Sequence, residues 1–315
     1  MIAHVKQANG VALKSSTPLQ VPLLGTTATP VVTLDISDGP LWANEEWEAA
    51  TLLGQDYLPD SRELMVEARL SKDAFLYWVQ WVGHLKIEPE RIQGRHWFGH
   101  LPLVLEMEML ELALSIHLAQ RQVPIIHAAA VELNGKAICL MAESGGGKSS
   151  LTAALVQSGA GFLNDDITAL WGDEFQVFPG HSLMRLNQDS ASAMLAEDLY
   201  SRLYPHRAES KMVTDVRQWG RVHPKPCPLS AVYLVEATTE TEQVTINPLR
   251  GYRGLYQMMS ASVGQAGWSI VRRGEQLRLW SRLMESIPIK HIVYPRRYKQ
   301  LPEVVAALLN DLGDW

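Results

Sequence analysis

The chain reads AESGGGKSS at residues 142–150, and this stretch carries the strongest signal for its fold. Glycine has no side chain to bury, and ordering its backbone costs more entropy than ordering that of any other residue. Three glycines in succession therefore lower stability unless a ligand that must approach the backbone closely offsets the loss. The residues that flank the glycines indicate which ligand that is.

The flanking residues predict a strand before the glycines and a helix after them. Residues 125–141 contain two β-like runs joined by an Asn-Gly pair, which is the strongest short-range signal for a two-residue hairpin. Counting outward from that turn places His127 opposite Ala142, at the start of the glycine stretch. Residues 149–161 have helical character and include glycines that would end the helix.

This order of strand, glycine-rich loop, Gly-Lys-Ser and helix is the context that a phosphate-binding loop requires. Backbone N–H groups would surround the phosphates, and the helix N-terminus would add its partial positive charge. Lys148 would reach the β- and γ-phosphate oxygens, and Ser149 would hold Mg²⁺. Ala142 replaces the usual first glycine, which requires a backbone without positive φ there. We expect the nucleotide to contact Glu143, Ser144, Gly145, Gly146, Gly147, Lys148, Ser149 and Ser150.

Two adjacent carboxylates, Asp165 and Asp166, follow Lys148 by seventeen and eighteen residues, near the end of a short buried run. If their strand neighbours the strand before the loop, both carboxylates reach the γ-phosphate region at the carboxyl ends of the strands. One can then bind Mg²⁺ while the other accepts a proton from an attacking hydroxyl. Adjacent strand residues point to opposite faces, so the two roles should differ. The alternative is an Asp-Asp turn without chemistry.

Residues 1–120 differ from the remainder and predict a smaller α+β domain in front of a catalytic domain at 121–315. Short β-rich runs alternate with turn signals, and an amphipathic segment from Leu101 to about Gln120 closes the first domain. This half holds five of the ten tryptophans. Such rings are more often core than surface, and the alternative is a groove that accepts a peptide. The five are Trp42, Trp47, Trp78, Trp81 and Trp97.

Charge and composition exclude several classes of partner. The formal net charge is −6, so no overall basic field attracts nucleic acid or an anionic membrane. The longest apolar segment contains three glutamates and a histidine, which a bilayer centre would penalise. The N-terminus lacks the apolar run of a secretion signal, and Cys139 and Cys227 lie too far apart for a redox motif. We expect a cytoplasmic protein with neither nucleic acid nor membrane as a partner.

Residues 127–166, HAAAVELNGKAICLMAESGGGKSSLTAALVQSGAGFLNDD, resemble the catalytic core of the HPr kinase/phosphorylase family. That family has a histidine on the hairpin before the loop, then the glycine-rich Gly-Lys-Ser, then two aspartates at the same spacing. A looser similarity to HPr-kinase-related proteins, including those of lasso-peptide systems, covers residues 10–24, 179–190, 228–236 and 294–309. Residues 1–120 do not resemble the regulatory domain of HPr kinases.

The resemblance implies an α/β fold, a P-loop kinase core of the HPr kinase and phosphoenolpyruvate carboxykinase type with a mixed sheet. It also implies ATP-dependent phosphorylation of a serine hydroxyl on a peptide or protein, with Mg²⁺, as in a peptide-tailoring kinase. By position, it makes Lys148 and Ser149 the phosphate and Mg²⁺ residues. It makes Asp165 the catalytic acid/base, Asp166 a carboxylate on the metal side and His127 a partner that tunes the acid/base. Relatives form ring-like assemblies, which leaves a homo-oligomer open without giving the oligomeric state.

The sequence leaves two alternatives open. The first is a small-molecule kinase or carboxykinase-like phosphoryl transferase on the same scaffold, which needs basic groups for an anionic substrate; Arg185, Arg272 and Arg273 are candidates. The second is a nucleotide-binding regulator with little catalysis. Only Asp165 argues against a regulator, since a switch has no need of a base beside the γ-phosphate.

Overall fold

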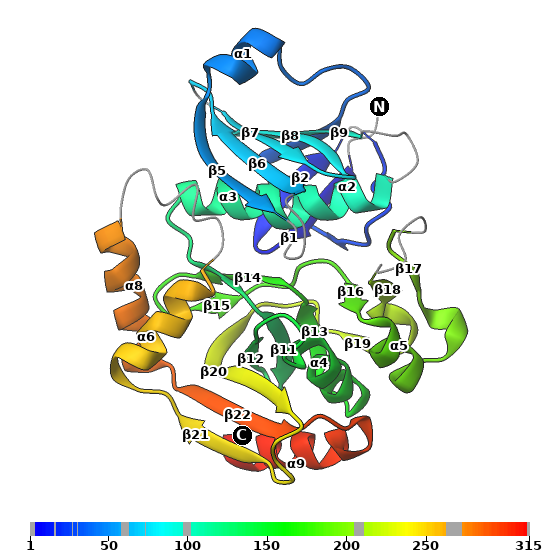
Figure 1. Ribbon diagram of the computed structural model, residues 1–315, viewed down its shortest axis with the longest axis vertical. Helices are drawn as coiled ribbons and strands as arrows, with labels where there is room; N and C mark the ends of the chain where they lie inside the picture. The colour runs from blue at the N-terminus through cyan, green and yellow to red at the C-terminus, as the bar shows by residue number, and fades with distance from the viewer. Residues whose placement is uncertain are drawn as a thin grey trace. The chain divides into compact units, whose positions relative to one another are not determined.

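The computed structural model forms two compact units: the first comprises Met1–Val123 together with Val263–Arg273, and the second comprises Pro124–Ser262 together with Gly274–Trp315. Both units contain mixed β-sheets and helices (Figure 1). The expected mixture of α and β structure is therefore present. The structure describes residues 4–15, 17–26, 28, 29, 31–57, 63–72, 74–96, 102–204, 211–262 and 273–313.

In the first unit, the described strands pair in one sheet in the order β3-β1-β2-β4-β9-β8-β7-β6-β5. Burial alternates along β8, as it must when one face of a strand packs on a core. The strands are β1 His4–Ala8, β2 Val11–Ser15, β3 Leu24–Gly25, β4 Val32–Ile36, β5 Thr51–Tyr57, β6 Leu64–Leu70, β7 Phe75–Val79, β8 Gly83–Glu88 and β9 Arg91–His96. A short helix, α1 Asn44–Ala49, precedes β5.

The segment expected to be amphipathic is helical, with α2 Pro102–Glu108, the π-helical turn η1 Met109–Ala113 and α3 Leu114–Gln120 in succession. It is buried almost all round rather than along one stripe. Glu106 shows why a carboxylate is tolerated there, because it accepts hydrogen bonds from the backbone N–H groups of Gln20 and Val21 at 2.6 and 2.9 Å. No helix in the described part of the chain is long and apolar enough to cross a membrane.

Acid should destabilise this unit through His117 of α3, which is fully buried. Burial lowers the pKa of His117 from 6.5 to about 4, so the unfolded chain binds the proton first as pH falls. The stability that depends on neutral His117 is thus present above pH 6.5 and is lost between pH 6.5 and about 4. Melting temperatures measured by circular dichroism over this pH range should show the loss. His117→Leu should make the melting temperature depend less on pH. An equal dependence of the melting temperature on pH in the parent and in His117→Leu would contradict this prediction.

The tryptophans of the first unit do not form its core. Trp42, Trp47, Trp78 and Trp81 are each half-buried, and Trp97 lies outside the described residues. The rings of Trp42 and Trp47 stack with centroids 5.2 Å apart, and the Arg69 guanidinium lies 4.8 Å from the Trp47 centroid. The interpretation as core is therefore wrong for the described tryptophans, and the peptide groove stays a prediction.

The second unit is built around a central sheet in which β13, β12, β20 and β22 run in the same direction. β12 and β22 pair with β20 on its two sides, and the antiparallel β11 separates β12 from β13. The carboxyl ends of the four parallel strands therefore lie at one edge of the sheet. The strands are β10 Ile125–His127, β11 Ala129–Leu133, β12 Lys136–Met141, β13 Gly161–Asn164, β14 Ile167–Trp171, β15 Gln176–Val177, β16 Leu183–Leu186, β17 Ser201–Arg202, β18 Met212–Asp215, β19 Arg221–Val222, β20 Cys227–Thr238, β21 Thr245–Pro248 and β22 Ile289–Pro295.

Both faces of this sheet are covered by helices, because β12 is apolar on both faces. Ile138 and Leu140 pack in the core with α4 and α9, and Cys139 and Met141 pack in the core with α6 and α8. This two-sided burial is typical of parallel strands in α/β proteins. The helices are α4 Lys148–Gln157, α5 Gln188–Met194, α6 Gly251–Ser260, α8 Arg273–Ser286 and α9 Leu301–Leu312, with the 3₁₀ turns η2 Glu197–Leu199, η3 Val216–Gln218 and η4 Tyr298–Gln300.

The expected hairpin is present from Leu133 paired with Lys136 to Ala129 paired with Leu140. The prediction that His127 lies opposite Ala142 is wrong. The ladder ends at Ala129, and His127 belongs to the separate strand β10, which pairs with β14. A hydrogen bond of 3.0 Å from Ala128 N to Ile126 O marks the turn between β10 and β11.

Candidate nucleotide site

The glycine loop joins β12 to α4 at the carboxyl edge of the central sheet, and its carbonyl oxygens are held from the sheet side. Gly145 O accepts from Arg296 at 2.8 Å, Gly146 O from Ala237 N at 2.9 Å, and Gly147 O from the Tyr294 hydroxyl at 3.2 Å. Arg296 follows β22, Tyr294 lies on β22 and Ala237 on β20. These contacts tie the loop backbone to β20 and to the end of β22.

Two positions in the loop require glycine. Gly145 and Gly147 have φ values of 78° and 97°, in the left-handed region that side chains disfavour. Ala142 has no positive φ, so the condition for alanine at that position is met. α4 begins directly after Gly147, and no side chain caps its N-terminus. Its first N–H groups and partial positive charge are therefore available to a ligand.

A cavity of about 540 Å³ lies over this loop. Its lining includes all eight residues expected to contact a nucleotide, from Glu143 to Ser150, together with His127 and Asp166. Asp165 does not line it and is only 3% exposed. Five further basic or aromatic side chains at its wall had no role in the sequence-based site: Lys211, Tyr294, Arg296, Arg297 and Tyr298.

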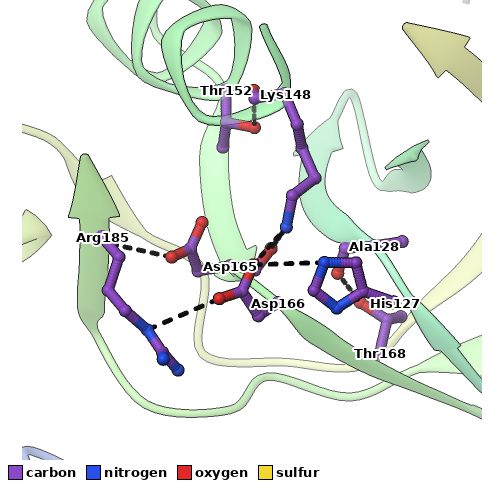
Figure 2. Close-up of polar contacts among 8 residues, drawn as sticks. All are labelled: His127, Ala128, Lys148, Thr152, Asp165, Asp166, Thr168 and Arg185. Atoms are coloured by element: carbon purple, nitrogen blue, oxygen red, sulfur yellow. Dashed lines mark hydrogen bonds and ion pairs between the residues drawn. The ribbon is translucent and has the colours of Figure 1, made fainter. Parts of the chain in front are cut away.

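The two aspartates occupy a corner between β13 and β14 and have different partners (Figure 2). Asp165 Oδ2 accepts a hydrogen bond of 2.8 Å from Arg185 N. Asp166 is paired with Lys148, and its Oδ2 lies 3.4 Å from Arg185 Nε. Lys148 Nζ also donates to the backbone oxygen of Asp165 at 3.0 Å. The two carboxylates thus have different partners, although neither residue lies on a strand, as the expectation of opposite faces had required.

Two details of the expected arrangement are wrong. β13 does not pair with β12, because β11 lies between them. The aspartates after β13 are linked to the loop after β12 by the side chain of Lys148, which donates to Asp165 O. His127 approaches Asp166 rather than Asp165, with Nε2 at 3.9 Å from Asp166 Oδ1. The Thr168 hydroxyl fixes the chain beside this histidine by donating to Ala128 O at 2.9 Å (Figure 2).

Burial and charge shift the pKa values of the two carboxylates in opposite directions. Burial, followed by the neighbouring Asp166, raises the pKa of Asp165 to about 6. Burial also opposes ionisation of Asp166, but Lys148 and the other nearby basic groups outweigh it and lower the pKa of Asp166. The pair therefore contains one carboxylate that stays charged and one that can take up a proton near neutral pH.

Partial desolvation, followed by the positive charge of Lys148, lowers the pKa of His127, even though 49% of its side chain is exposed. His127 is therefore neutral at pH 7. It can donate or accept a hydrogen bond in the cavity without adding a positive charge.

The cavity is basic although the chain is acidic. Lys148, Arg185, Lys211, Arg296 and Arg297 line it against three carboxylates, whereas the chain as a whole carries −6. A polyanion such as a phosphate chain fits this excess of positive charge. Of the arginines considered for a small anionic substrate, Arg185 is at the wall; Arg272 and the side chain of Arg273 lie outside the described residues.

The donor set fits Mg²⁺ held jointly with phosphates. Ser149 and Asp166 both line the cavity. Within the described ranges, no three His, Cys, Asp or Glu side chains gather to enclose an ion. Mg²⁺ commonly binds through one or two protein ligands plus substrate phosphates, so this set suffices only with a nucleotide present.

Alanine at Gly147 should impair the loop more than alanine at Gly145. A Cβ at Gly147 would meet the Tyr294 hydroxyl and lie 2.9 Å from Ala237 Cβ, whereas a Cβ at Gly145 would meet nothing within 4 Å. Both changes carry the backbone strain of a positive φ, and only Gly147→Ala adds the clash. We expect Gly147→Ala to lower the melting temperature and ATP affinity further than Gly145→Ala. Equal melting temperatures and equal ATP affinities for the two variants would contradict this geometry.

Comparison with known proteins gave a result only for structure. No family model and no curated protein matches the chain. Among solved structures, the chain is similar to the HPr(Ser) kinase/phosphatase from Coxiella burnetii. The two are 10% identical with a TM-score of 0.32, over 59% of this chain and 95% of that one.

Proposed function

We propose that the cavity binds ATP with Mg²⁺ and that the protein transfers the γ-phosphate to a serine hydroxyl of a peptide or protein. One observation carries this proposal. A glycine loop, an uncapped helix N-terminus, a buried lysine and Asp166 meet at one basic cavity, and the buried Asp165, whose pKa is shifted in the opposite direction, directly precedes Asp166 in the chain. Binding of a phosphate chain and removal of a proton from a hydroxyl need this combination.

The phosphates would bind at the start of α4. N–H groups of the first helical turn and Lys148 supply donors and positive charge, and Arg296 holds the loop in place. Lys148 already lies against Asp166, so a bound γ-phosphate would share the ammonium group with that carboxylate. Ser149 and Asp166 would hold Mg²⁺, which neutralises charge on the phosphates when bound.

We assign the proton acceptor to Asp165. Its raised pKa suits a general base near neutral pH. In the described part of the chain, its buried Oδ1 has no hydrogen-bond partner, and only the bond from Arg185 N holds Oδ2. A rotation that breaks one hydrogen bond would turn this carboxylate toward an acceptor. The serine oxygen then bonds to the γ-phosphorus, the bond to the β-phosphate oxygen breaks, ADP leaves and Asp165 takes the proton.

His127 has a role through Asp166 in this arrangement. Its neutral imidazole lies 3.9 Å from the Asp166 carboxylate, at the cavity wall beside Lys148. We assign it to orienting the metal-side carboxylate, in place of the expected contact with Asp165.

A small anionic acceptor is the second candidate, because Arg185 and Lys211 line the cavity together with Asp166. The two acceptors are separated by incubation with γ-labelled ATP, Mg²⁺ and either serine peptides or phosphorylated metabolites. The proposal predicts label on a peptide serine and none on the matching Ser→Ala peptide. Label only on a metabolite would favour the second candidate. Release of label only as free phosphate would contradict transfer to any acceptor tested.

A further inference from the structure

The cavity continues past the loop along a chain of hydrogen-bonded hydroxyl groups. Ser150 Oγ lies 2.9 Å from Ser190 Oγ on α5, which lies 3.1 Å from the Tyr298 hydroxyl on η4. All three residues line the cavity, and Ser190 is only 5% exposed. These hydrogen-bonded hydroxyl groups join the first turn of α4 to α5 and η4, two elements that play no part in the carboxylate corner.

Helix geometry separates the two ends of the cavity. Successive residues of an α-helix are about 100° apart around its axis, so Lys148 and Ser150 point about 200° apart. Lys148 contacts the corner with Asp166, whereas Ser150 contacts α5 and, through it, η4. The carboxylate end and the hydroxyl end therefore lie on opposite sides of the first turn of α4.

We propose that the nucleoside end of the nucleotide binds at the hydroxyl end, with its base against the ring of Tyr298. This inference rests on the proposed nucleotide site and adds the direction in which the nucleotide lies. The reacting phosphate must be near Asp165 and Asp166, so the nucleoside extends away from them, past Ser150. The acceptor would then enter at the carboxylate end, where His127 lines the wall.

Tyr298 has the properties of a stacking platform. Its hydroxyl is fixed by Ser190, while the residue remains 41% exposed, so a ring held in place still has free surface. The apolar Leu301 lines the cavity beside it, and Asp189 supplies a carboxylate that can accept from ribose hydroxyls. The carboxylate end, by contrast, is lined by Lys148, Arg185 and Asp166, whose charges disfavour an uncharged base.

The test compares two probes on the full chain by calorimetry, ADP and inorganic tripolyphosphate, each with Mg²⁺. Stacking of a base on an aromatic ring accounts for roughly 5- to 150-fold in affinity by alanine substitution. Tyr298→Ala should weaken ADP binding within this range and leave tripolyphosphate binding unchanged. Tyr298→Phe, which keeps the ring, should retain ADP affinity within about twofold. Tyr252→Ala, which removes a tyrosine that is 77% exposed and outside the cavity lining, is the control.

Three results would overturn the assignment. ADP affinity that is unchanged in Tyr298→Ala, while Lys148→Ala abolishes it, would remove the base from Tyr298 and leave the nucleotide site intact. Equal weakening of both probes by Tyr298→Ala would mean that Tyr298 acts on the loop or the phosphates. Failure of the parent protein to bind either probe would refute the nucleotide site and this inference together.

Discussion

Replacement of Lys148 by alanine is expected to weaken ATP binding by about 10²–10³-fold. Each hydrogen bond to a charged group contributes about 1.5–3 kcal/mol, and an ammonium group can donate several to the phosphates. Lys148 is only 8% exposed, so little water would replace these interactions. Calorimetric titration with ATP and Mg²⁺ measures the affinity. Lys136→Ala, on the exposed turn of the hairpin, is the control and should bind as the parent does.

Loss of Lys148 also leaves Asp166 with fewer partners, because Arg185 and His127 are then its nearest basic groups. Stability is therefore expected to fall, since a half-buried carboxylate that loses its main ion-pair partner is less well compensated. Lys148→Ala combined with Asp166→Asn removes that charge and should restore the melting temperature without restoring ATP affinity. Unchanged ATP affinity in a folded Lys148→Ala protein would contradict a phosphate-binding role for the loop.

Asp165→Asn is expected to slow phosphate transfer by at least about a hundredfold at saturating ATP and Mg²⁺. A positioned base typically contributes about 10²–10⁴-fold, and asparagine keeps the size of aspartate without its basicity. The side-chain amide oxygen that Asp165→Asn introduces can still accept from Arg185 N, so the fold and ATP affinity should persist. In the parent, transfer should fall as pH drops through the raised pKa of Asp165, near 6, because the protonated carboxyl cannot accept a proton.

Asp166→Asn is the matched change one residue away, and its expected effect is different. Asp166 lines the cavity and carries the charge that Mg²⁺ would need, so its loss should raise the Mg²⁺ concentration for half-maximal transfer. Rapid-quench assays over a range of Mg²⁺ and pH separate the two effects. If Asp165→Asn transfers at the parent rate and Asp166→Asn stays slow even at saturating Mg²⁺, Asp166 rather than Asp165 is the base.

The local parts of the site could be predicted from the sequence, because short-range rules determine them. An Asn-Gly turn fixed the register of the hairpin, and three glycines before Lys148 marked the loop and the start of the helix. Asp165 and Asp166 do have different partners, but they lie in the bend between β13 and β14, so the alternation along a strand from which this was expected is absent. Each of these features depends on residues close together in the chain.

The errors concern pairings between distant segments. β11 lies between β12 and β13, and no local pattern shows which strand will take that place. The chain turns at Ala128, so His127 does not belong to the hairpin and pairs with β14 instead. Arg296 and Tyr298 reach the cavity only because β22 pairs with β20, more than fifty residues away in sequence, so the sequence alone did not relate them to the loop.

Hydrogen–deuterium exchange on the intact protein, with and without saturating ATP and Mg²⁺, tests whether the glycine loop and the start of α4 bind the nucleotide. If the N–H groups of the loop and of the first turn of α4 bind phosphates, the nucleotide should slow exchange at residues 144–150. Lys148→Ala, at the same nucleotide concentration, should show no such slowing. Exchange at residues 144–150 that is unchanged by saturating nucleotide in the parent protein would contradict the assignment of this cavity as the ATP site.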